Sequence, residues 1–204
     1  MGFYFDGTRC IGCKTCELAC KDYKNLSTAV TFRNVFEYSG GTWTINDDDT
    51  YSTDAFKYFT SVACNHCDMP ACLAACPTGA ISKSGDEGIV LIDEEICIGC
   101  GSCAAACPYH APSLDDETTK GLKCDSCQDR RAEGKGPICV EACLTRAIEF
   151  GSIEELRSKY GNVDDVAPLP DPAQTQPNLI VRPSTMAKPF NDTTGHISNP
   201  KEIM

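Results

Sequence analysis

The stretch CIGCGSCAAACP, residues 97–108, decides the fold of this chain. Three of its cysteines recur at every third residue, and the fourth stands directly before a proline. The remaining cysteines form three more groups of four: Cys10, Cys13, Cys16 and Cys20; Cys64, Cys67, Cys72 and Cys76; and Cys124, Cys127, Cys139 and Cys143. None of the sixteen cysteines is left over, so the count closes on four 4Fe–4S clusters with four thiolates each.

Two other uses of cysteine fit this spacing poorly. Cysteines at positions i, i+3 and i+6 would compete for a single disulfide partner. Zinc usually takes its ligands as two separated pairs and has no role for a third cysteine three residues after a pair. A structural zinc protein is therefore a minor alternative, which metal analysis excludes if iron reaches about sixteen atoms per chain.

The run at residues 97–108 is also the run of bacterial two-cluster ferredoxins, in which the cysteine before proline binds the other cluster. The preceding cysteine group ends in the same way, at Cys76-Pro77. Between the two groups, Ala80–Ser82 and Ile89–Asp93 predict a short β-hairpin. Residues 61–119 therefore predict one complete ferredoxin-like unit.

The first and fourth cysteine groups lie on either side of this unit, next to two strand-like segments, Phe3–Asp6 and Ala147–Phe150. The simplest assembly joins both ends of the core as a second ferredoxin-like unit, into which the first is inserted. We predict an α+β fold of two such units with two 4Fe–4S clusters each, a β-rich insertion and an extended C-terminal tail. The predicted domains are the outer unit at 1–24 and 120–151, the β-hairpin insertion at 25–60, the inner unit at 61–119, and a short helix with a partner-binding tail at 152–204.

The insertion between the first two cysteine groups is rich in strand-forming residues. Thr31–Tyr38 and Thr42–Ile45 predict a hairpin with its turn at Ser39-Gly40-Gly41, and Phe56–Val62 predicts a further strand. Trp43 is the only tryptophan of the chain. We expect it to pack in the core, although a contact with a partner protein is the alternative.

The segment after the fourth cysteine group changes in composition. Ser152 and Glu155 predict a capped helix that Gly161 terminates. Repeated prolines then predict an extended path without a core of its own. Because Asn178–Val181 is too apolar for a solvated tail, we expect it to lie as a strap on a larger subunit.

The ferredoxin rule predicts the inner ligand sets. They are Cys76, Cys97, Cys100 and Cys103 for one cluster, and Cys64, Cys67, Cys72 and Cys107 for the other. By pseudo-symmetry, the outer sets are Cys10, Cys13, Cys16 and Cys143, and Cys20, Cys124, Cys127 and Cys139. Iron held through these cysteines is the only metal expected. Gly12, Gly99 and Gly101 lie inside the cysteine turns, where a backbone N–H can point at sulfur and raise the reduction potential.

Other residues offer little further chemistry. His66 and His110 stand beside predicted ligands, and we expect them to pack or to form hydrogen bonds there. No nucleophile–base pair and no phosphate-binding loop emerges from the sequence. We therefore expect no active site in this chain itself.

The charge of the chain excludes one class of partner. The formal net charge is −11, so the sequence lacks the basic face that nucleic-acid binding requires. The longest clean aliphatic run, Ile89–Ile92, is far short of a membrane span. Met1 leads directly into the first strand-like segment without a signal-peptide pattern. We expect membrane contact and export to depend on partner subunits.

Residues around the cysteines resemble those of a known family. Residues 10–23, CIGCKTCELACKDY, are similar to the opening of the four-cluster iron–sulfur subunits of the molybdopterin oxidoreductases. Further matches lie at Cys64–Cys67, Cys76–Ala80, Cys107–Tyr109 and Lys123–Cys143. The tail segments Asp192–Gly195 and Asn199–Glu202 resemble the dimethyl sulfoxide reductase iron–sulfur subunit in particular.

Two positions refine the resemblance. Relatives in nitrate reductase carry tryptophan where this chain has Cys100, and they build a 3Fe–4S centre there. Cysteine at this position therefore implies four cubanes. Leu144 follows Cys143 where relatives often have proline, a difference that concerns the local backbone rather than ligation.

The resemblance implies a non-catalytic electron-transfer subunit of an anaerobic reductase similar to dimethyl sulfoxide reductase. Such a subunit carries single electrons through its clusters to a large catalytic subunit with a bis-molybdopterin centre of molybdenum or tungsten. The electrons come from a membrane subunit that oxidises menaquinol, or from another donor. The cluster of Cys76, Cys97, Cys100 and Cys103 would lie toward the quinol side.

The resemblance also bears on where the chain works and on what else it could be. The chain would be membrane-associated through its partners or belong to a soluble heteromeric complex. The alternative function is a free polyferredoxin that shuttles electrons between enzymes. Co-purification with a large molybdenum protein distinguishes the two.

Overall fold

The structure, a computed structural model, describes residues 1–203. Its strands are β1 (Gly2–Asp6), β2 (Arg33–Gly40), β3 (Trp43–Ile45), β4 (Tyr51–Thr53), β5 (Phe56–Ala63), β6 (Ile81–Lys83), β7 (Val90–Ile92), β8 (Ser113–Leu114), β9 (Gly121–Leu122), β10 (Ile148–Gly151), β11 (Leu179–Arg182) and β12 (Gly195–Ile197). Its helices are α1 (Thr15–Tyr23), α2 (Ala71–Ala74), α3 (Ser102–Ala106), α4 (Gln128–Ala132), α5 (Ile138–Glu141) and α6 (Ile153–Tyr160), with 3-10 turns η1 (Pro172–Gln174) and η2 (Pro200–Glu202). The predicted mixture of short helices and strands is confirmed.

The N-terminal strand lies at the centre of a three-stranded sheet with the order β10-β1-β11. It runs antiparallel to β10, with Phe3 opposite Phe150, and parallel to β11, with Tyr4 opposite Ile180. Since alternate residues of a strand point to opposite faces, Phe3 and Phe5 enter the main core while Tyr4 and Ile180 pack beneath α6. Strands that flank the first and the fourth cysteine groups therefore meet in one sheet.

The C-terminal segment contributes β11 to this sheet, which corrects the expectation of a strap on another subunit. Leu179, Ile180 and Val181 are all buried in the core of the chain itself. The apolar composition of this segment indicates that it is buried, but composition alone does not say against which surface.

The insertion forms one long hairpin instead of the predicted turn at Gly40-Gly41. β2 pairs with β5 along its whole length, from Arg33 opposite Ala63 to Gly40 opposite Phe56. β12 adds to the other edge of β2. The chain continues past Gly41 into β3, which pairs with β4. We call β3, β4 and the turn between them, residues 43–53, the arm.

Polar residues at the tip of the arm make the turn. Asp48 accepts hydrogen bonds from the backbone N–H and the hydroxyl of Thr50, at 3.2 and 2.6 Å, an arrangement typical of turns. A Cβ on Gly41 would lie 2.5 Å from the carbonyl oxygen of Asp54. This glycine therefore allows the paired strand to approach closely, which is a different use of glycine from a turn.

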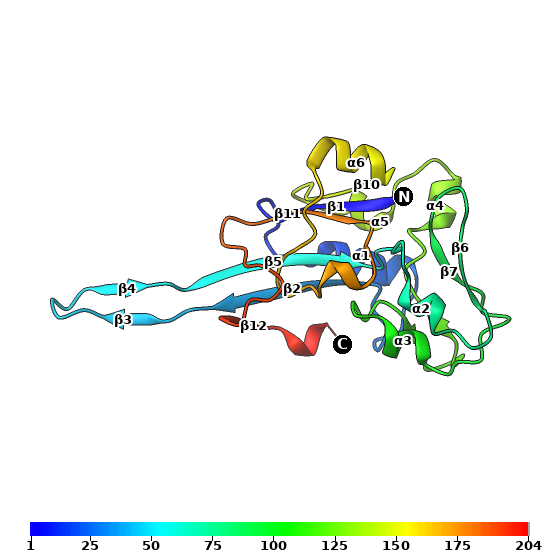
Figure 1. The fold of residues 1–204 in the computed structure, drawn as a ribbon, viewed down its shortest axis with the longest axis horizontal. Coiled ribbons are helices and arrows are strands. Elements are labelled where there is room, and N and C mark those ends of the chain that lie inside the picture. Colours follow the sequence, from blue (N-terminus) through cyan, green and yellow to red (C-terminus); the bar gives the residue numbers. More distant parts are fainter. Residues whose placement is uncertain (204) are drawn as a thin grey trace.

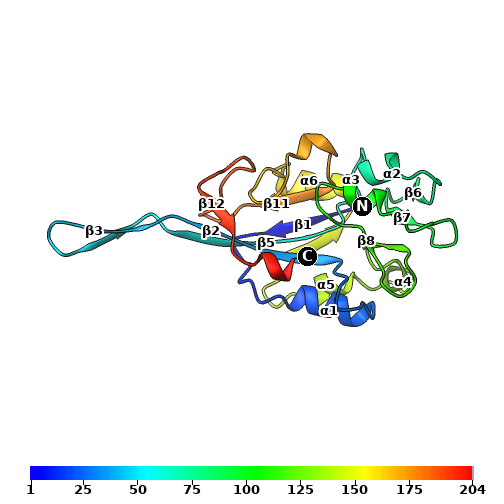
Figure 2. The ribbon, with the colours of Figure 1, turned by 90° about the horizontal axis from the view of Figure 1, so that it is seen from below.

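The arm projects far from the rest of the molecule (Figure 1). The short helices α2, α3 and α4 and the hairpin of β6 and β7 gather at the opposite end (Figure 2). Trp43 lies in the arm and is 70% exposed, so the expectation that it packs in the core is wrong. Its size favours burial, but the two-stranded arm has no further layer of the chain to cover it.

Two local predictions are confirmed. β6 pairs antiparallel with β7, with Ile81 opposite Ile92, as the hairpin pattern predicts. Helix α6 begins after Ser152, whose hydroxyl accepts a hydrogen bond from the backbone N–H of Glu155, and it ends at Gly161. Within residues 1–203, no helix has both the length and the apolar character needed to cross a bilayer.

The burial of β11 predicts the effect of one substitution. Ile180→Ala removes a side chain that is 1% exposed, and such changes cost about 2–5 kcal/mol. In a domain of this size, we expect the Tm of the chain, measured under anoxic conditions, to fall by at least about 4 °C. The control Val163→Ala alters a side chain that is 43% exposed and should leave the Tm nearly unchanged. An unchanged Tm for Ile180→Ala would mean that the tail is not part of the core.

Candidate iron–sulfur sites

Three hollows of similar size are each lined by four cysteines. The cavity volume of each is about 20 Å³. The first is lined by Cys64, Cys67, Cys72 and Cys107, the second by Cys76, Cys97, Cys100 and Cys103, and the third by Cys10, Cys13, Cys16 and Cys143. Each hollow brings together the cysteines of one set expected from the sequence.

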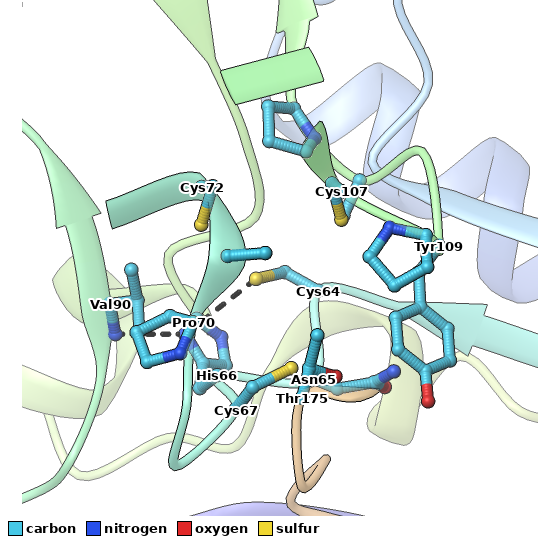
Figure 3. A pocket seen from close by; sticks show the side chains of 14 residues that line it. Cys64, Asn65, His66, Cys67, Pro70, Cys72, Val90, Cys107, Tyr109 and Thr175 are labelled. Atoms are coloured by element: carbon cyan, nitrogen blue, oxygen red, sulfur yellow. Dashed lines mark hydrogen bonds between the residues drawn. The ribbon is translucent and has the colours of Figure 1, made fainter. Parts of the chain in front are cut away.

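The sulfur atoms of the first hollow come from three separate parts of the chain. Cys64 and Cys67 follow β5, Cys72 lies on α2, and Cys107 caps the end of α3. Figure 3 shows the four side chains pointing inward, with Tyr109 at one side. Prolines and alanines make up much of the remaining lining, so the hollow offers sulfur ligands in apolar surroundings.

The fourth expected set, Cys20, Cys124, Cys127 and Cys139, is the only one whose members are all buried in the part of the chain that the structure describes. Helix α1, which carries Cys20, packs against α5, which carries Cys139. Burial, followed by the charge of the Cys139 thiolate, raises the pKa of Cys20 to about 12. Thiolates gathered in such a place require a cation, and iron meets this demand.

The donor set fits polynuclear clusters. All sixteen cysteines are free thiols, not disulfides. No three Cys, His, Asp or Glu side chains among residues 1–203 meet closely enough to hold a single ion. Twelve of the sulfur atoms instead surround the three hollows, and a cubane needs such a hollow because each of its four iron atoms takes one thiolate.

The first Cys-x-x-Cys segment of each cysteine group places a left-handed residue directly before its second cysteine. The φ angles of Gly12, His66, Gly99 and Ser126 are 69°, 45°, 68° and 57°. This bend lets both sulfur atoms of a segment face the same side. Glycine adopts the conformation readily, whereas for the other residues it costs about 1–2 kcal/mol. The sequence identified the two glycines but not the equivalent roles of His66 and Ser126.

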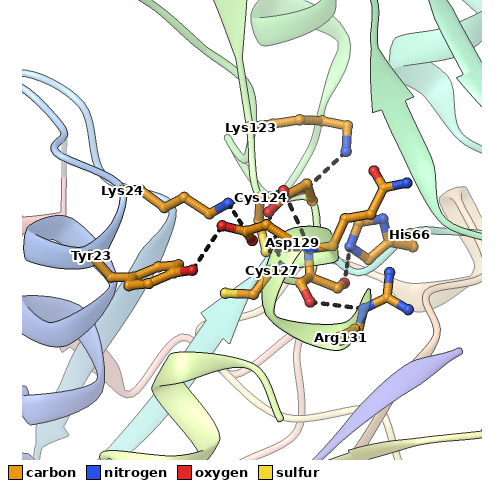
Figure 4. A network of polar contacts seen from close by, with 11 residues as sticks. Tyr23, Lys24, His66, Lys123, Cys124, Cys127, Asp129 and Arg131 are labelled. Carbon is orange, nitrogen blue, oxygen red and sulfur yellow. Dashed lines mark hydrogen bonds and ion pairs between the residues drawn. The ribbon is translucent and has the colours of Figure 1, made fainter. Parts of the chain in front are cut away.

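His66 and Ser126 form a hydrogen bond with each other. The Nδ1 atom of His66 accepts a hydrogen bond from the backbone N–H of Val90 at 3.0 Å, so Nε2 carries the proton and donates to Ser126 Oγ at 2.8 Å. The backbone N–H of Ser126 donates to Cys124 Sγ at 3.4 Å. The pair therefore holds two strained cysteine loops against each other (Figure 4). His110, the other histidine singled out in the sequence, is exposed.

Polar contacts at the surface join α1 to the loop that begins α4 (Figure 4). Lys24 Nζ contacts the carboxylates of Asp125 and Asp129 at 3.0 and 3.1 Å. The hydroxyl of Tyr23 donates to Asp129 at 2.7 Å. These contacts link the helix that carries Cys20 to the loop that carries Cys124 and Cys127 of its expected set.

Hydroxyl groups two residues after a cysteine form another recurrent feature. The distances from hydroxyl oxygen to sulfur are 3.4, 3.7, 3.3 and 3.8 Å for the pairs Thr15 and Cys13, Thr78 and Cys76, Ser102 and Cys100, and Thr145 and Cys143. A hydrogen bond to a ligating sulfur raises the reduction potential of a cluster. The pattern Cys-x-Thr or Cys-x-Ser is its sequence signal, which cysteine spacing alone does not reveal.

Comparison with family models agrees with this geometry. The model of the 4Fe-4S dicluster domain matches residues 55–153, and that of a 4Fe-4S binding domain matches residues 8–24. Over 202 residues the chain is 51% identical to the B subunit of the anaerobic dimethyl sulfoxide reductase of Escherichia coli (strain K12), covering 99% of this chain and 98% of that protein. The chain belongs to this family of iron–sulfur subunits.

Other relatives show that the family includes iron–sulfur subunits of several organisms and of a second kind of enzyme. The B subunit of the anaerobic dimethyl sulfoxide reductase of Haemophilus influenzae is 52% identical over 202 residues, with 99% of this chain and 98% of that protein covered. The iron–sulfur subunit of the nitrate-inducible formate dehydrogenase of Escherichia coli (strain K12) is 35% identical over 158 residues, which cover 74% of this chain and 54% of that protein. The resemblance stated from the sequence is therefore confirmed.

The turn geometry predicts an unequal effect of two glycine substitutions. Gly79 and Gly99 both have left-handed φ angles, of 71° and 68°, so alanine strains the backbone equally. A Cβ on Gly99 would lie 1.9 Å from the carbonyl oxygen of Thr119, whereas a Cβ on Gly79 meets nothing within 4 Å. Gly99→Ala should therefore displace its cysteine loop and lose about four iron atoms per chain, while Gly79→Ala keeps them. Equal iron contents of the two variants would contradict this assignment.

Proposed function

We propose that this chain carries single electrons through four 4Fe–4S clusters to the molybdopterin catalytic subunit of an anaerobic reductase similar to dimethyl sulfoxide reductase. The electrons come from a membrane subunit that oxidises menaquinol. The gathering of twelve cysteines around three hollows, together with the burial of the other four, carries this proposal. When bound, a 4Fe–4S cluster supplies one-electron chemistry within its range of potentials.

The proposed ligand sets follow the linings of the hollows and the buried fourth group. They are Cys10, Cys13, Cys16 and Cys143; Cys20, Cys124, Cys127 and Cys139; Cys64, Cys67, Cys72 and Cys107; and Cys76, Cys97, Cys100 and Cys103. The nested arrangement of two ferredoxin-like units is part of the proposal. The pairing of β1 with β10 on either side of the inner region supports it.

Shared apolar clusters support an order of the sets through the molecule. Cys16 and Cys139 share one apolar cluster, which joins the first set to the buried set. Cys124 and Cys64 share a second cluster, which joins the buried set to the set that includes Cys64 and Cys107. Cys72 packs in a third cluster with Cys103, which leads to the last set. We therefore place the sets in one series, which begins at the set of Cys13 and ends at the set of Cys100.

The two ends of this series are open to partners. Cys13 and Cys100 are the exposed cysteines of the described chain, and they belong to the first and the last set. Next to them, Ile11 is 61% and Ile98 is 65% exposed, so an apolar side chain stands at each end. A series that is buried in its middle and open at both ends suits a subunit between two partners. A free polyferredoxin, the alternative function, would instead be purified without a large partner.

The arm supports a fixed partner. Trp43 and Ile45 point to one face of β3, and Tyr51 lies opposite Ile45 on the same face. All three side chains are at least 66% exposed, and an isolated two-stranded hairpin is only marginally stable in water. The arm continues from β2 and β5. Val35 of β2 and Ser61 of β5 line the third hollow, which holds the set that includes Cys13. We therefore assign the apolar face of the arm to the catalytic subunit, at this end of the series.

Cys100→Ser tests the proposed path at the quinol end. Because Cys100 is exposed, its replacement should leave the fold intact but convert or destroy one cluster. Quinol-linked turnover of the complex should be lost. Turnover with an artificial reductant that supplies the catalytic subunit should persist, which serves as the control for assembly. Four intact cubanes by EPR in this variant would sink the ligand assignment.

Trp43→Ala tests the role of the arm. Removing a tryptophan from the centre of an interface costs about 2 kcal/mol or more, so binding to the catalytic subunit should weaken roughly thirtyfold. Thr44→Ala, on the opposite face of the same strand, is the matched control and should bind normally. The measurement is the Kd between the purified subunits. Equal Kd values for the two variants would remove the arm from the interface.

A further inference from the structure

Arg33 is a fully buried cation at the start of β2. Its exposed fraction is 2%, and it is one of the largest side chains enclosed by the structure. Nothing in the cysteine pattern points to it, and neither the ligand sets nor the arm involves it. Burial of a guanidinium is unfavourable unless an anion or a full set of acceptors compensates its charge.

The contacts that the described residues make with Arg33 are too few for this purpose. Its Nη1 atom donates to the carbonyl oxygen and to Oγ of Ser61, at 3.4 and 3.1 Å. Its guanidinium carbon lies 4.7 Å from the centre of the Phe3 ring. The Nε and Nη2 atoms have no hydrogen-bond partner in the described part of the chain. Two donor nitrogens of a buried cation are therefore left to a group beyond the protein atoms.

Arg33 lies next to the buried cysteine set, because Ala63, its partner across the β2–β5 pair, shares an apolar cluster with Cys20 and Cys124. Burial alone would lower the pKa of Arg33, but four thiolates raise it above its ordinary value, those of Cys139, Cys16, Cys124 and Cys20. Ser61 also connects the cation to one of them, because its Oγ lies 3.4 Å from Cys16 Sγ. Of these cysteines, Cys16 belongs to the first proposed ligand set and the other three belong to the buried set.

We propose that Arg33 is the shared counter-ion of the two clusters held by the outer cysteine sets, and that it raises the reduction potentials of both. The inference rests on the proposed function, since it requires those clusters. Reduction adds one negative charge to a cluster, and a buried cation nearby stabilises that charge because the surroundings screen it little. Arg33 is a positioning and tuning residue, since the iron ligands are the cysteines.

The test is an EPR-monitored redox titration of the full chain, purified under anoxic conditions with its partner subunits. Arg33→Met keeps the length of the side chain and removes its charge. We expect the equilibrium constant for reduction to fall at least about tenfold at two of the four clusters, which is about 59 mV for one electron, and to stay unchanged at the other two. Arg33→Lys, which keeps the charge, should shift these two clusters by less than half as much.

Arg182→Met is the matched control, because the Arg182 side chain is 63% exposed and water screens its charge. It should leave all four potentials unchanged. Unchanged potentials in Arg33→Met, or equal shifts in Arg33→Met and Arg33→Lys, would overturn the proposal. Arg33→Met could lose the outer clusters altogether. In that case, a full iron content in Arg33→Lys would support the proposal, because the positive charge alone would then preserve the clusters. The same loss of iron in both variants would overturn the proposal. A wild-type chain without iron would instead overturn the proposed function.

Discussion

The whole structure depends on one constraint, which is that four sulfur atoms from distant parts of the chain must face one small volume. The first Cys-x-x-Cys segment of each cysteine group meets this constraint locally through a left-handed residue before the second cysteine. The central sheet meets the same constraint over long distances in the sequence. β1 precedes the first cysteine group, β10 follows the fourth, and the pairing of the two strands brings these groups together. The short helices and small hairpins hold these loops in place, and the apolar clusters between them include the cysteines themselves.

The sequence predicted what repeats locally and missed what depends on distant contacts. The ferredoxin rule and pseudo-symmetry predicted the sets of cysteines that line the three hollows, and the patterns around β6, β7 and α6 predicted those elements. The turn at Gly40-Gly41 was wrong because glycine serves close approach of strands as well as turns. Trp43 and the tail strand β11 were misplaced because apolar character does not specify which surface covers a residue. Arg33 was missed because its place among thiolates arises only from tertiary packing.

The distribution of charge and exposure suits a subunit between two partners. The chain has a formal net charge of −11, yet it encloses Arg33 where thiolates of two proposed ligand sets come together. One set in the middle of the proposed series is wholly buried, which protects it from water and lowers the local dielectric constant; it comprises Cys20, Cys124, Cys127 and Cys139. Cys13 and Cys100 are exposed at its two ends. The arm adds an apolar face that a free shuttle would have no reason to display.

The central claim is that the sixteen cysteines hold four 4Fe–4S clusters in a chain bound to a molybdenum or tungsten enzyme. The most direct test is metal analysis and EPR spin quantitation of the chain purified under anoxic conditions together with whatever binds it. We predict about sixteen iron atoms per chain, four reducible 4Fe–4S clusters, and molybdenum or tungsten in a large co-purifying subunit. Zinc in place of iron, or fewer than four clusters in a fully loaded preparation, would contradict the claim.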